Sequence, residues 1–477
     1  MTEALPALLV FVPFLAGVLQ FVADRRGIPV LPVLTTVVTA ALTGWLIADV
    51  AANGSVEHFL GGWEPPLGIR LYADGLAAVM LLMTAVTGTM VSVYALASHG
   101  RHNPDGSHFW TLWLLLWGSL NALFLSGDLF NIYVTLELVS LAAIPLVLLA
   151  GARKTTDATL RYLLFALFGS LVYLAGVALV YGIAGTLDLS LAAEPMADSG
   201  FAGALAASCL LIGIMVKAAL VPFHVWLPAA HGGAPAAASA LLSALVVKAA
   251  VYLMLRLWTE PLAGLASAPA GQFLGALGAA AILYGSLRAL VQERLKLVIA
   301  YSTIAQLGYM LLFFPMAVTL AWEGAVYHGL AHGVAKAALF LAAGNIIAYV
   351  GHDRLREITG LDRTLAISLF AFALAAVSIM GLPPSGGFIA KWLLLRAAVE
   401  TGQWWWLVVL TVGGLLAAAY MFRVLRFAFL RSAGPTIDRQ GPRPSMLMAW
   451  PTMVLALLAI ALGLGAAPVL NLLGGLP

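Results

Sequence analysis

The sequence predicts an all-α integral membrane protein of about 14 transmembrane helices. Of its 477 residues, 62% are hydrophobic and only 9% are Asp, Glu, Lys or Arg, whereas a soluble domain carries about 25% charged residues. Apolar stretches of roughly 20 residues, the length at which a helix crosses a bilayer, recur along the whole chain. The alternating strands of a transmembrane barrel are absent from the pattern. This composition excludes an aqueous multi-domain protein.

Fourteen apolar stretches are predicted to span the membrane, with short loops between them. They lie near residues 4–22, 29–49, 72–97, 110–126, 129–150, 160–183, 201–222, 236–256, 271–290, 297–316, 324–350, 365–395, 404–430 and 446–472. The chain begins MTEALPALLVF, which has no basic n-region and no small-residue cleavage site, so we expect the first stretch to remain as a helix. The longest extramembrane segments lie near 50–71, 184–200 and 431–445.

Lysine and arginine residues orient the bundle, because cytoplasmic loops carry an excess of them. With both termini outside, 17 of the 24 basic residues fall in inner loops, three fall in outer loops (Arg70, Arg256 and Arg396), and four lie inside apolar stretches. The inner set is Arg25, Arg26, Arg101, Arg153, Lys154, Arg161, Arg288, Arg294, Lys296, Arg354, Arg356, Arg363, Arg423, Arg426, Arg431, Arg439 and Arg443. This split predicts a multi-pass protein of the bacterial inner membrane with both termini on the outer side.

Five ionisable residues lie inside the apolar stretches, where each costs about 2.5–3.5 kcal/mol or more to insert. They are Glu137, Lys217, Lys248, Lys336 and Lys391. Structural ion pairs are one interpretation, but four lysines cannot all pair with one glutamate. Burial disfavours the charged form of an ionisable group, so the lysines are expected to be neutral in part or to lie in hydrated cavities. Either arrangement describes a path for protons, and a carboxylate that moves toward or away from a lysine would act as its switch.

Histidines extend this line of titratable groups. His328, His332 and Lys336 follow one another at i, i+4 spacing in YHGLAHGVAKAALF and therefore share one helix face. A metal site is the weaker interpretation, because a lysine continues the face and no carboxylate lies close in sequence. The single cysteine, Cys209, excludes an internal disulfide, a cluster or a thiolate zinc site. No cofactor and no metal are therefore expected. His224 and His231 flank a proline-rich turn, where a polar cap on a helix end is an equal alternative.

Two of the predicted helices carry breaks beside a buried lysine. Pro222 follows Lys217 by five residues in VKAALVPFHVWLP, and Pro383, Pro384, Gly386 and Gly387 precede Lys391 in GLPPSGGFIAKW. Proline removes a backbone donor and disrupts the preceding turn, and interrupted helices at matching places in two halves are typical of ion sites in inverted-repeat transporters. In the predicted orientation the two lysine-bearing helices run in opposite directions, as an inverted repeat requires.

Several long motifs resemble the antiporter-type membrane subunits shared by respiratory complex I and the multisubunit Mrp sodium/proton antiporters. They are LFLSGDLFNIYVTLELVSLAAIPLVLL, VKAALVPFHVWLPAAHGGAPAAASALLSALVVKAAVYLMLR, ERLKLVIAYSTIAQLGYM, HGLAHGVAKAALFLAAGNI and MGLPPSGGFIAKWLL. GGWEPPLGIRLYADGLAAVMLL is most similar to the D-type member of the Mrp set. The resemblance implies N-terminal helices 1–3 (1–109), two inverted five-helix repeats (110–257 and 270–431) and a last helix (446–477).

The resemblance also implies roles for the buried residues. The switch pair falls on Glu137 and Lys217, the central relay on Lys248, His332 and Lys336, and the exit-side group on Lys391. The sequence departs from the family before the tenth helix, where relatives often carry an aspartate and an adjacent Lys-Arg pair and this chain reads QERLKLV. Glu293, Arg294 and Lys296 are the candidates to substitute for them, but the resemblance does not support a loop role for these residues.

These inferences predict a proton-translocating subunit of an Mrp-type Na⁺/H⁺ antiporter. Its expected partners are other membrane subunits and lipid, its expected ions are H⁺ and Na⁺, and no nucleic acid is expected. A proton-pumping membrane subunit of a complex I-like oxidoreductase or membrane-bound hydrogenase is an alternative, as is an energy-coupling subunit of an inorganic-carbon uptake complex. In all three cases the chain is a transporter subunit with no redox centre of its own. Asp74 and Asp128 lie near outer helix ends, where helix-end solvation is favoured over sodium binding.

Overall fold

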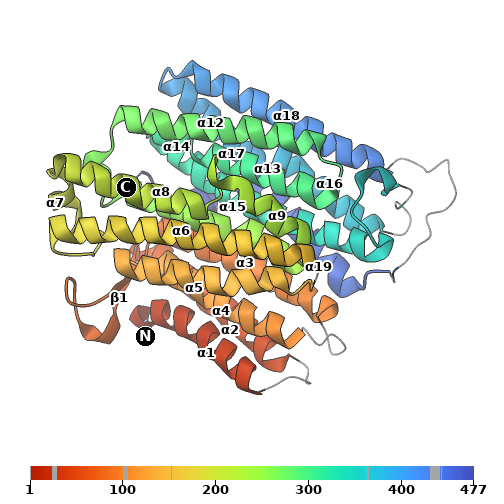
Figure 1. Cartoon of the computed structure of the whole chain (residues 1–477), viewed down its shortest axis with the longest axis horizontal. Coiled ribbons are helices and arrows are strands. Elements are labelled where there is room, and N and C mark those ends of the chain that lie inside the picture. Colours follow the sequence, from red (N-terminus) through yellow and green to blue (C-terminus); the bar gives the residue numbers. More distant parts are fainter. Residues whose placement is uncertain are drawn as a thin grey trace.

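The computed structural model describes residues 2–23, 29–99, 106–151, 153–359, 361, 365–429, 441 and 443–476. Most of them lie in a bundle of long helices that run side by side (Figure 1). Within these residues, 13 helices are long and apolar enough to cross a membrane. Two shorter helices, α16 (Ala366–Met380) and α17 (Gly386–Glu400), occupy the span predicted near 365–395. The predicted all-α membrane fold is confirmed.

The helices follow the predicted spans closely. In the first part of the chain they are α1 (Leu5–Ala23), α2 (Val30–Asn53), α3 (Gly75–Ser98), α4 (Gly106–Leu125), α5 (Leu129–Leu148), α6 (Arg153–Ala184) and α8 (Gly200–Lys217). The central crossing consists of α10 (Ala236–Leu241), the π-helical segment Leu242–Val246 and α11 (Val247–Thr259). The remaining long helices are α12 (Ala268–Val291), α13 (Leu295–Met310), α15 (Thr319–Val350), α18 (Trp404–Phe429) and α19 (Met446–Leu464). Short helices α7 (Ala193–Ala197), α14 (Phe313–Met316) and α20 (Ala467–Leu473) lie in the connections.

Both predicted helix breaks are present. Helix α8 ends at Lys217, and the chain turns through Ala219, whose φ of 53° is left-handed, before the short helix α9 (Trp226–Gly233). Helix α16 ends at Met380, and Gly381 at φ 78° leads into the proline pair that precedes α17. Glycine adopts a left-handed φ without strain because it has no Cβ. This explains Gly381 but not Ala219. The division into two inverted repeats at 110–257 and 270–431 stays a prediction.

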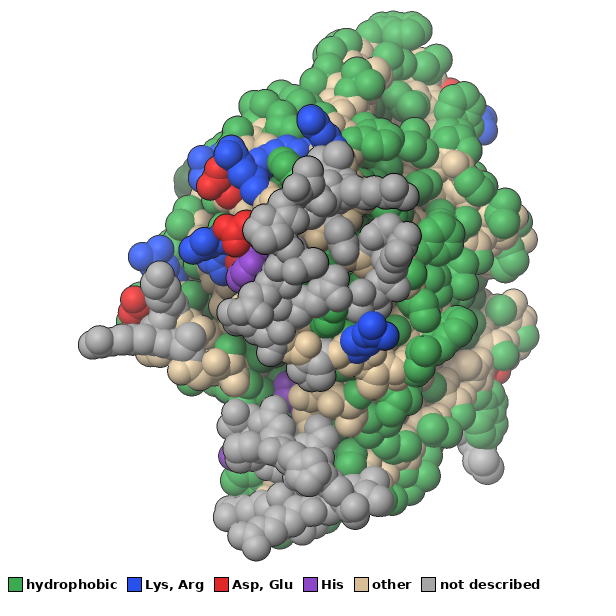
Figure 2. Space-filling model, turned by 90° about the vertical axis from the view of Figure 1, so that its right-hand side faces the viewer, with side chains coloured by type: hydrophobic (Ala, Val, Ile, Leu, Met, Phe, Trp, Pro, Cys, Tyr) green, Lys and Arg blue, Asp and Glu red, His purple; other side chains and the backbone are tan. Residues whose placement is uncertain are grey.

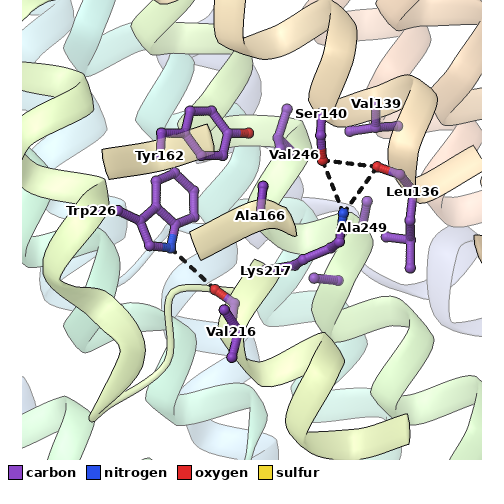
Figure 3. A pocket seen from close by; sticks show the side chains of 11 residues that line it. Leu136, Val139, Ser140, Tyr162, Ala166, Val216, Lys217, Trp226, Val246 and Ala249 are labelled. Atoms are coloured by element: carbon purple, nitrogen blue, oxygen red, sulfur yellow. Dashed lines mark hydrogen bonds between the residues drawn. The ribbon is translucent and has the colours of Figure 1, made fainter. Parts of the chain in front are cut away.

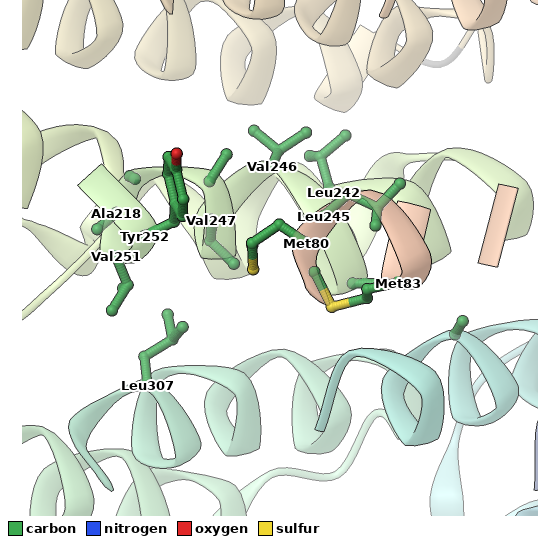
Figure 4. Packing of buried hydrophobic residues seen from close by; sticks show 14 of the residues in the cluster. Met80, Met83, Ala218, Leu242, Leu245, Val246, Val247, Val251, Tyr252 and Leu307 are labelled. Atoms are coloured by element: carbon green, nitrogen blue, oxygen red, sulfur yellow. The ribbon is translucent and has the colours of Figure 1, made fainter. Parts of the chain in front are cut away.

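The core of the bundle surrounds the 32-residue helix α15, which contacts α3, α10, α13, α16, α17 and α19. Methionines from α3, Met80 and Met83, pack beside Leu242, Leu245 and Val246 of the central crossing (Figure 4). The helices α10 and α11 with the segment between them are buried along their whole length. A helix that is buried on every side reads as uniformly apolar in sequence, so any charge on it faces protein and not lipid.

The structure also contains a β-hairpin that the sequence pattern did not predict. Strands β1 (Val56–Phe59) and β2 (Arg70–Ala73) form this antiparallel hairpin in the connection between α2 and α3. The predicted span that starts near residue 72 therefore begins in a strand, and the helix starts only at Gly75. The segment is short and rich in Gly and Pro, and two short strands give too little alternation to detect.

The two ends of the bundle differ in charge. Both termini lie toward one end of the bundle (Figure 1). The opposite end carries a group of Lys and Arg side chains with a few acidic ones (Figure 2), including the ion pairs Arg294–Asp353, Arg354–Glu357 and Arg356–Glu293. Termini at one end are consistent with an even number of spans. Several basic residues used in the orientation argument lie outside the described residues or have undescribed side chains: Arg25, Arg26, Arg101, Arg153, Lys154, Arg363, Arg431 and Arg439.

Candidate functional site

The first predicted pair, Glu137 and Lys217, is in contact. The Lys217 ammonium lies 3.1 Å from Glu137 Oε1. It also donates to Ser140 Oγ at 3.0 Å and to the Leu136 carbonyl at 3.3 Å (Figure 3). Ser170 Oγ of α6 donates to the same carboxylate oxygen. Lys217 is buried at the last residue of α8, while the Glu137 side chain keeps 21% of its exposure. The lysine is therefore fixed by the protein, and the glutamate is the partner with room to move.

A small cavity of about 10 Å³ adjoins the Lys217 side chain. Its wall includes Tyr162 and Trp226, whose rings stack with centroids 4.1 Å apart. The indole of Trp226 donates to the Val216 carbonyl next to the helix break (Figure 3). A volume of this size holds about one water molecule, so the cavity can place one water beside the lysine.

Lys248 lies at the centre of the molecule with no exposed surface. It is the second residue of α11, just after the π-helical segment, and its ammonium donates to the Ser243 carbonyl within that segment. Single turns of π-helix leave the backbone irregular and occur often at functional sites. Among the described residues no carboxylate lies within ion-pair distance of Lys248, so the sequence-based expectation of an unpaired lysine holds here.

Helix α15 brings the predicted histidine face to the same region. The rings of His328 and His332 stack at 5.6 Å, and neither nitrogen of His332 has a hydrogen-bond partner among the described residues although the ring is buried. Lys336 is fully buried and donates to Ser302 Oγ and, at 2.8 Å, to the Ile299 carbonyl of α13. The described residues contain no group of three or more His, Cys, Asp or Glu side chains placed to hold a metal ion.

Lys391 occupies the second helix break. Its ammonium donates to the carbonyls of Ile379 at 2.9 Å and Met380 at 3.2 Å and lies 4.6 Å above the centre of the Tyr309 ring. The Tyr309 ring in turn lies near the His328 ring, with ring centroids 5.2 Å apart. Aromatic contacts thus link Lys391, Tyr309, His328 and His332 in one row, and Tyr309 is a member that was not predicted from the sequence.

Two further buried cations were expected in loops. Arg256, expected in an outer loop, lies in the last turn of α11 with only 3% exposure. Its guanidinium donates two hydrogen bonds of 2.6 and 2.7 Å to Asp74 and one of 2.7 Å to Glu260. Lys296, expected in an inner loop, lies in the first turn of α13, buried, and donates to the Ala234 carbonyl. The predicted spans ended at residue 256 and began at residue 297, so boundary errors of a few residues concealed both.

The two aspartates considered for sodium binding serve as helix caps. Asp74 accepts from Ala77 N at 2.9 Å at the start of α3, and Asp128 accepts from Asn131 N at 2.7 Å at the start of α5. Burial would raise the pKa of Asp74, but the Arg256 guanidinium outweighs it and holds the pKa below its usual range. Burial raises the pKa of Asp128. A carboxylate at a helix N-terminus satisfies free N–H groups, so helix capping accounts for both positions.

The fold and these buried residues define a class of protein: a polytopic membrane protein with two broken helices and several buried lysines and histidines, of which only Lys217 has a carboxylate partner among the described residues. The profile of the family described as NADH:quinone oxidoreductase/Mrp antiporter, TM, matches residues 126–417, and the chain belongs to this family.

Individual relatives agree with this assignment over nearly the whole chain. The chain is 34% identical to the N subunit of the NADH-quinone oxidoreductase of Desulforudis audaxviator, over 97% of this chain and 96% of the relative. It is 29% identical to the D subunit of the Na(+)/H(+) antiporter of Alkalihalophilus pseudofirmus, over 96% of this chain and 94% of the relative. Among solved structures, a chain of the Mrp complex from Dietzia sp. DQ12-45-1b superposes with a TM-score of 0.91 at 28% identity, covering 99% of this chain and 96% of that one.

Proposed function

We propose that this chain is the proton-translocating D-type subunit of a multisubunit Mrp-type Na⁺/H⁺ antiporter. The observation that carries the proposal is the set of buried lysines, of which one has a carboxylate partner and the others, among the described residues, donate to carbonyls and hydroxyls. Uncompensated charges in an apolar interior are costly and mark ion and proton pathways. The chain itself is a transporter subunit, and energy coupling resides in the complex.

The proposed path uses Glu137, Lys217, Lys248, His332, Lys336 and Lys391. A proton enters one half-channel and reaches Lys217, passes laterally through the lysine and histidines on α11 and α15, and leaves beside Lys391. Buried polar atoms without a protein partner are usually satisfied by water, and both nitrogens of His332 are of this kind among the described residues. Water bridges the gaps between groups that do not touch.

Movement of Glu137 relative to Lys217 is the proposed switch. With the carboxylate at 3.1 Å the ammonium form of the lysine is favoured, because an opposite charge nearby stabilises it. When the carboxylate turns away, the lysine remains in a buried site that disfavours its charge, and it passes its proton to the next group.

A second candidate is a proton-pumping subunit of a complex I-like redox complex, which the 34% identity to an N subunit of an NADH-quinone oxidoreductase favours. The residues of the path serve it equally well, and only the source of energy differs. Redox chemistry would then reside in partner subunits.

The test is transport by the whole complex, purified with its partner subunits and reconstituted in liposomes that contain a pH-sensitive dye. Under the first proposal an imposed Na⁺ gradient drives proton movement, and Lys217→Ala and Lys391→Ala each reduce it at least tenfold, whereas Arg356→Ala, at an exposed position, does not. Proton movement that requires quinone reduction and ignores Na⁺ supports the second candidate. Unchanged transport in both lysine variants contradicts the relay in either form.

Orientation is part of the proposal. The basic end formed by Arg294, Arg354 and Arg356 faces the cytoplasm, and both termini face outward, in accord with the excess of basic residues in cytoplasmic loops. A cysteine introduced at Arg356 in a variant without Cys209 should react with an impermeant thiol reagent in inside-out vesicles and not in intact cells.

A further inference from the structure

The lysine at the second helix break is held without an acid, and the break itself supplies its acceptors. In an α-helix the carbonyl of residue i accepts from the N–H of residue i+4, so the carbonyls of Ile379 and Met380 would be bonded by residues 383 and 384. Both of these are proline and have no N–H. The two carbonyls that the prolines leave free are the two to which Lys391 donates, at 2.9 and 3.2 Å.

These carbonyls also form the negative end of α16. The last carbonyls of a helix lack partners within it and carry a partial negative charge that favours a nearby cation. The lysine stem reaches them across Gly381, where an added Cβ would lie 2.6 Å from Lys391 Cδ. An ammonium has three N–H donors, and the carbonyls accept two of them.

The third side of the ammonium faces the ring of Tyr309. The distance of 4.6 Å from Nζ to the ring centre lies within the range of about 6 Å over which an aromatic face attracts a cation. Tyr309 is fully buried, and its hydroxyl has no hydrogen-bond partner among the described residues. The ring face, therefore, and not the hydroxyl, is the part of Tyr309 that interacts with the lysine.

We propose that Tyr309 is a positioning residue that stabilises the ammonium form of Lys391 through its ring face, in place of a carboxylate, and so sets the pH range in which Lys391 exchanges protons with the histidine row. This inference rests on the proposed function. Tyr309 is near both groups: its ring centroid lies 4.6 Å from Lys391 Nζ and 5.2 Å from the His328 ring.

Few other ionisable groups face Lys391. Among the helices packed against α17, α15 contributes His328 and His332, and α18 contributes Tyr420 beside Tyr309. The described parts of the other three, α14, α16 and α19, contain no ionisable side chain. Arg396, one turn further along α17, pairs electrostatically with Glu323. The ring of Tyr309 is therefore the principal side-chain group that favours the charged lysine.

The experiment is the pH profile of Na⁺-driven proton transport by the reconstituted complex for wild type, Tyr309→Phe, Tyr309→Leu and Lys391→Ala. Tyr309→Phe keeps the ring face, and we expect its profile to match wild type. Tyr309→Leu removes the ring, and we expect the alkaline limb of the profile to move by about one pH unit toward acid, as the loss of a desolvated cation–π contact implies. Coincident profiles for Tyr309→Leu and wild type, or equal shifts for Tyr309→Phe and Tyr309→Leu, would overturn the inference.

Lys391→Ala separates this inference from the proposed function. If Lys391→Ala transports like wild type, the relay is wrong whatever Tyr309 does; if it is inactive while the Tyr309→Leu profile is unmoved, only the ring is excluded. Should Tyr309→Leu fail to assemble, phenylalanines of increasing fluorination at position 309 weaken the ring's attraction for cations at nearly constant size. A stepwise shift of the profile with fluorination supports the inference, and a constant profile contradicts it.

Discussion

The two broken helices hold their lysines in different ways. At the first break Lys217 ends α8 and contacts a carboxylate, Glu137, from another helix. At the second break Lys391 lies inside α17 and contacts only carbonyls of α16 and an aromatic ring among the described residues. A carboxylate on a side chain with 21% exposure can move, whereas backbone carbonyls at a helix end and a fully buried ring cannot move without repacking.

Under the proposed function, this difference separates a switch at the first break from a fixed site at the second. Charge at Lys217 depends on where Glu137 lies, so a change in the surrounding subunits can be transmitted to it. Charge at Lys391 depends on groups set by the fold, so it responds to the proton supply from the histidine row. The comparison predicts that variants at the first break alter coupling, while variants at the second alter the pH range of transport.

The largest effect is expected for Glu137→Ala. Removing one partner of a buried ion pair leaves the other charge uncompensated, at a cost of about 3–5 kcal/mol, so the charged form of Lys217 would be strongly disfavoured. We expect Na⁺-driven proton transport to fall at least 100-fold in reconstituted complex. Glu293→Ala, at a side chain with 71% exposure, is the matched control. Full activity of the Glu137 variant would show that the pair is structural only.

A second test alters the fixed site through its backbone. In Gly381→Ala the new Cβ would lie 2.6 Å from Lys391 Cδ, at a φ of 78°, so the lysine side chain must shift, which disturbs its contacts with the two carbonyls. We expect transport to fall about tenfold, or 1.4 kcal/mol. Gly402→Ala is the control, because Gly402 has a φ of 68° and nothing within 4 Å of an added Cβ, so it carries the backbone strain alone. Equal losses in the two variants would attribute the effect to strain and not to the lysine.

Much of the first site and part of the second could be predicted from the sequence. Apolar stretches reveal the helices, and a lone Glu137 or Lys391 within them is conspicuous because burial of a charge is rare. The prolines likewise reveal both breaks, since no continuous helix accommodates them without losing a bond. Contacts between distant segments carry no such local signal, so the lysine that meets the glutamate could be named only from the family resemblance.

Tyr309, Arg256 and Lys296 were missed for different physical reasons. An aromatic residue in an apolar helix is usually packing, and only its place above Lys391 in space gives it a further role. Arg256 and Lys296 lie one to three residues inside helix ends, which is within the uncertainty of any boundary. The β-hairpin was missed because strands of four residues in a loop rich in Gly and Pro give no clear alternation.

A smaller effect is expected from Ser170→Ala, which acts on the mobile partner of the first pair. Ser170 Oγ donates to Glu137 Oε1, and a hydrogen bond to a charged group contributes about 1.5–3 kcal/mol. Part of this is replaced by water because the glutamate is partly exposed, so we expect a loss of coupling of about threefold. Ser208→Ala is the control, since Ser208 is exposed and, among the described residues, its hydroxyl donates to Ala204 O of its own helix. A pH profile shifted in the manner of Tyr309→Leu would contradict the assignment of this region to coupling.

The smallest effect on transport is expected where a buried cation is fully paired. Arg256 lies on α11 two turns from Lys248, but it has two carboxylates, Asp74 and Glu260, while Lys248 has none among the described residues. Because Arg256 holds the pKa of Asp74 below its usual range, the pair contributes its full stability at pH 7 and loses it only as the pH falls below about 4.

Asp74→Asn keeps a capping side chain and removes the charge. At pH 7 we therefore expect thermal inactivation of the complex at a temperature several degrees lower, with transport per assembled complex and its pH profile unchanged. Asp198→Asn, in the short connection after α7, should leave both quantities at wild-type values. A shifted pH profile for Asp74→Asn would instead place Arg256 within the proton path, because pairing alone predicts stability without titration.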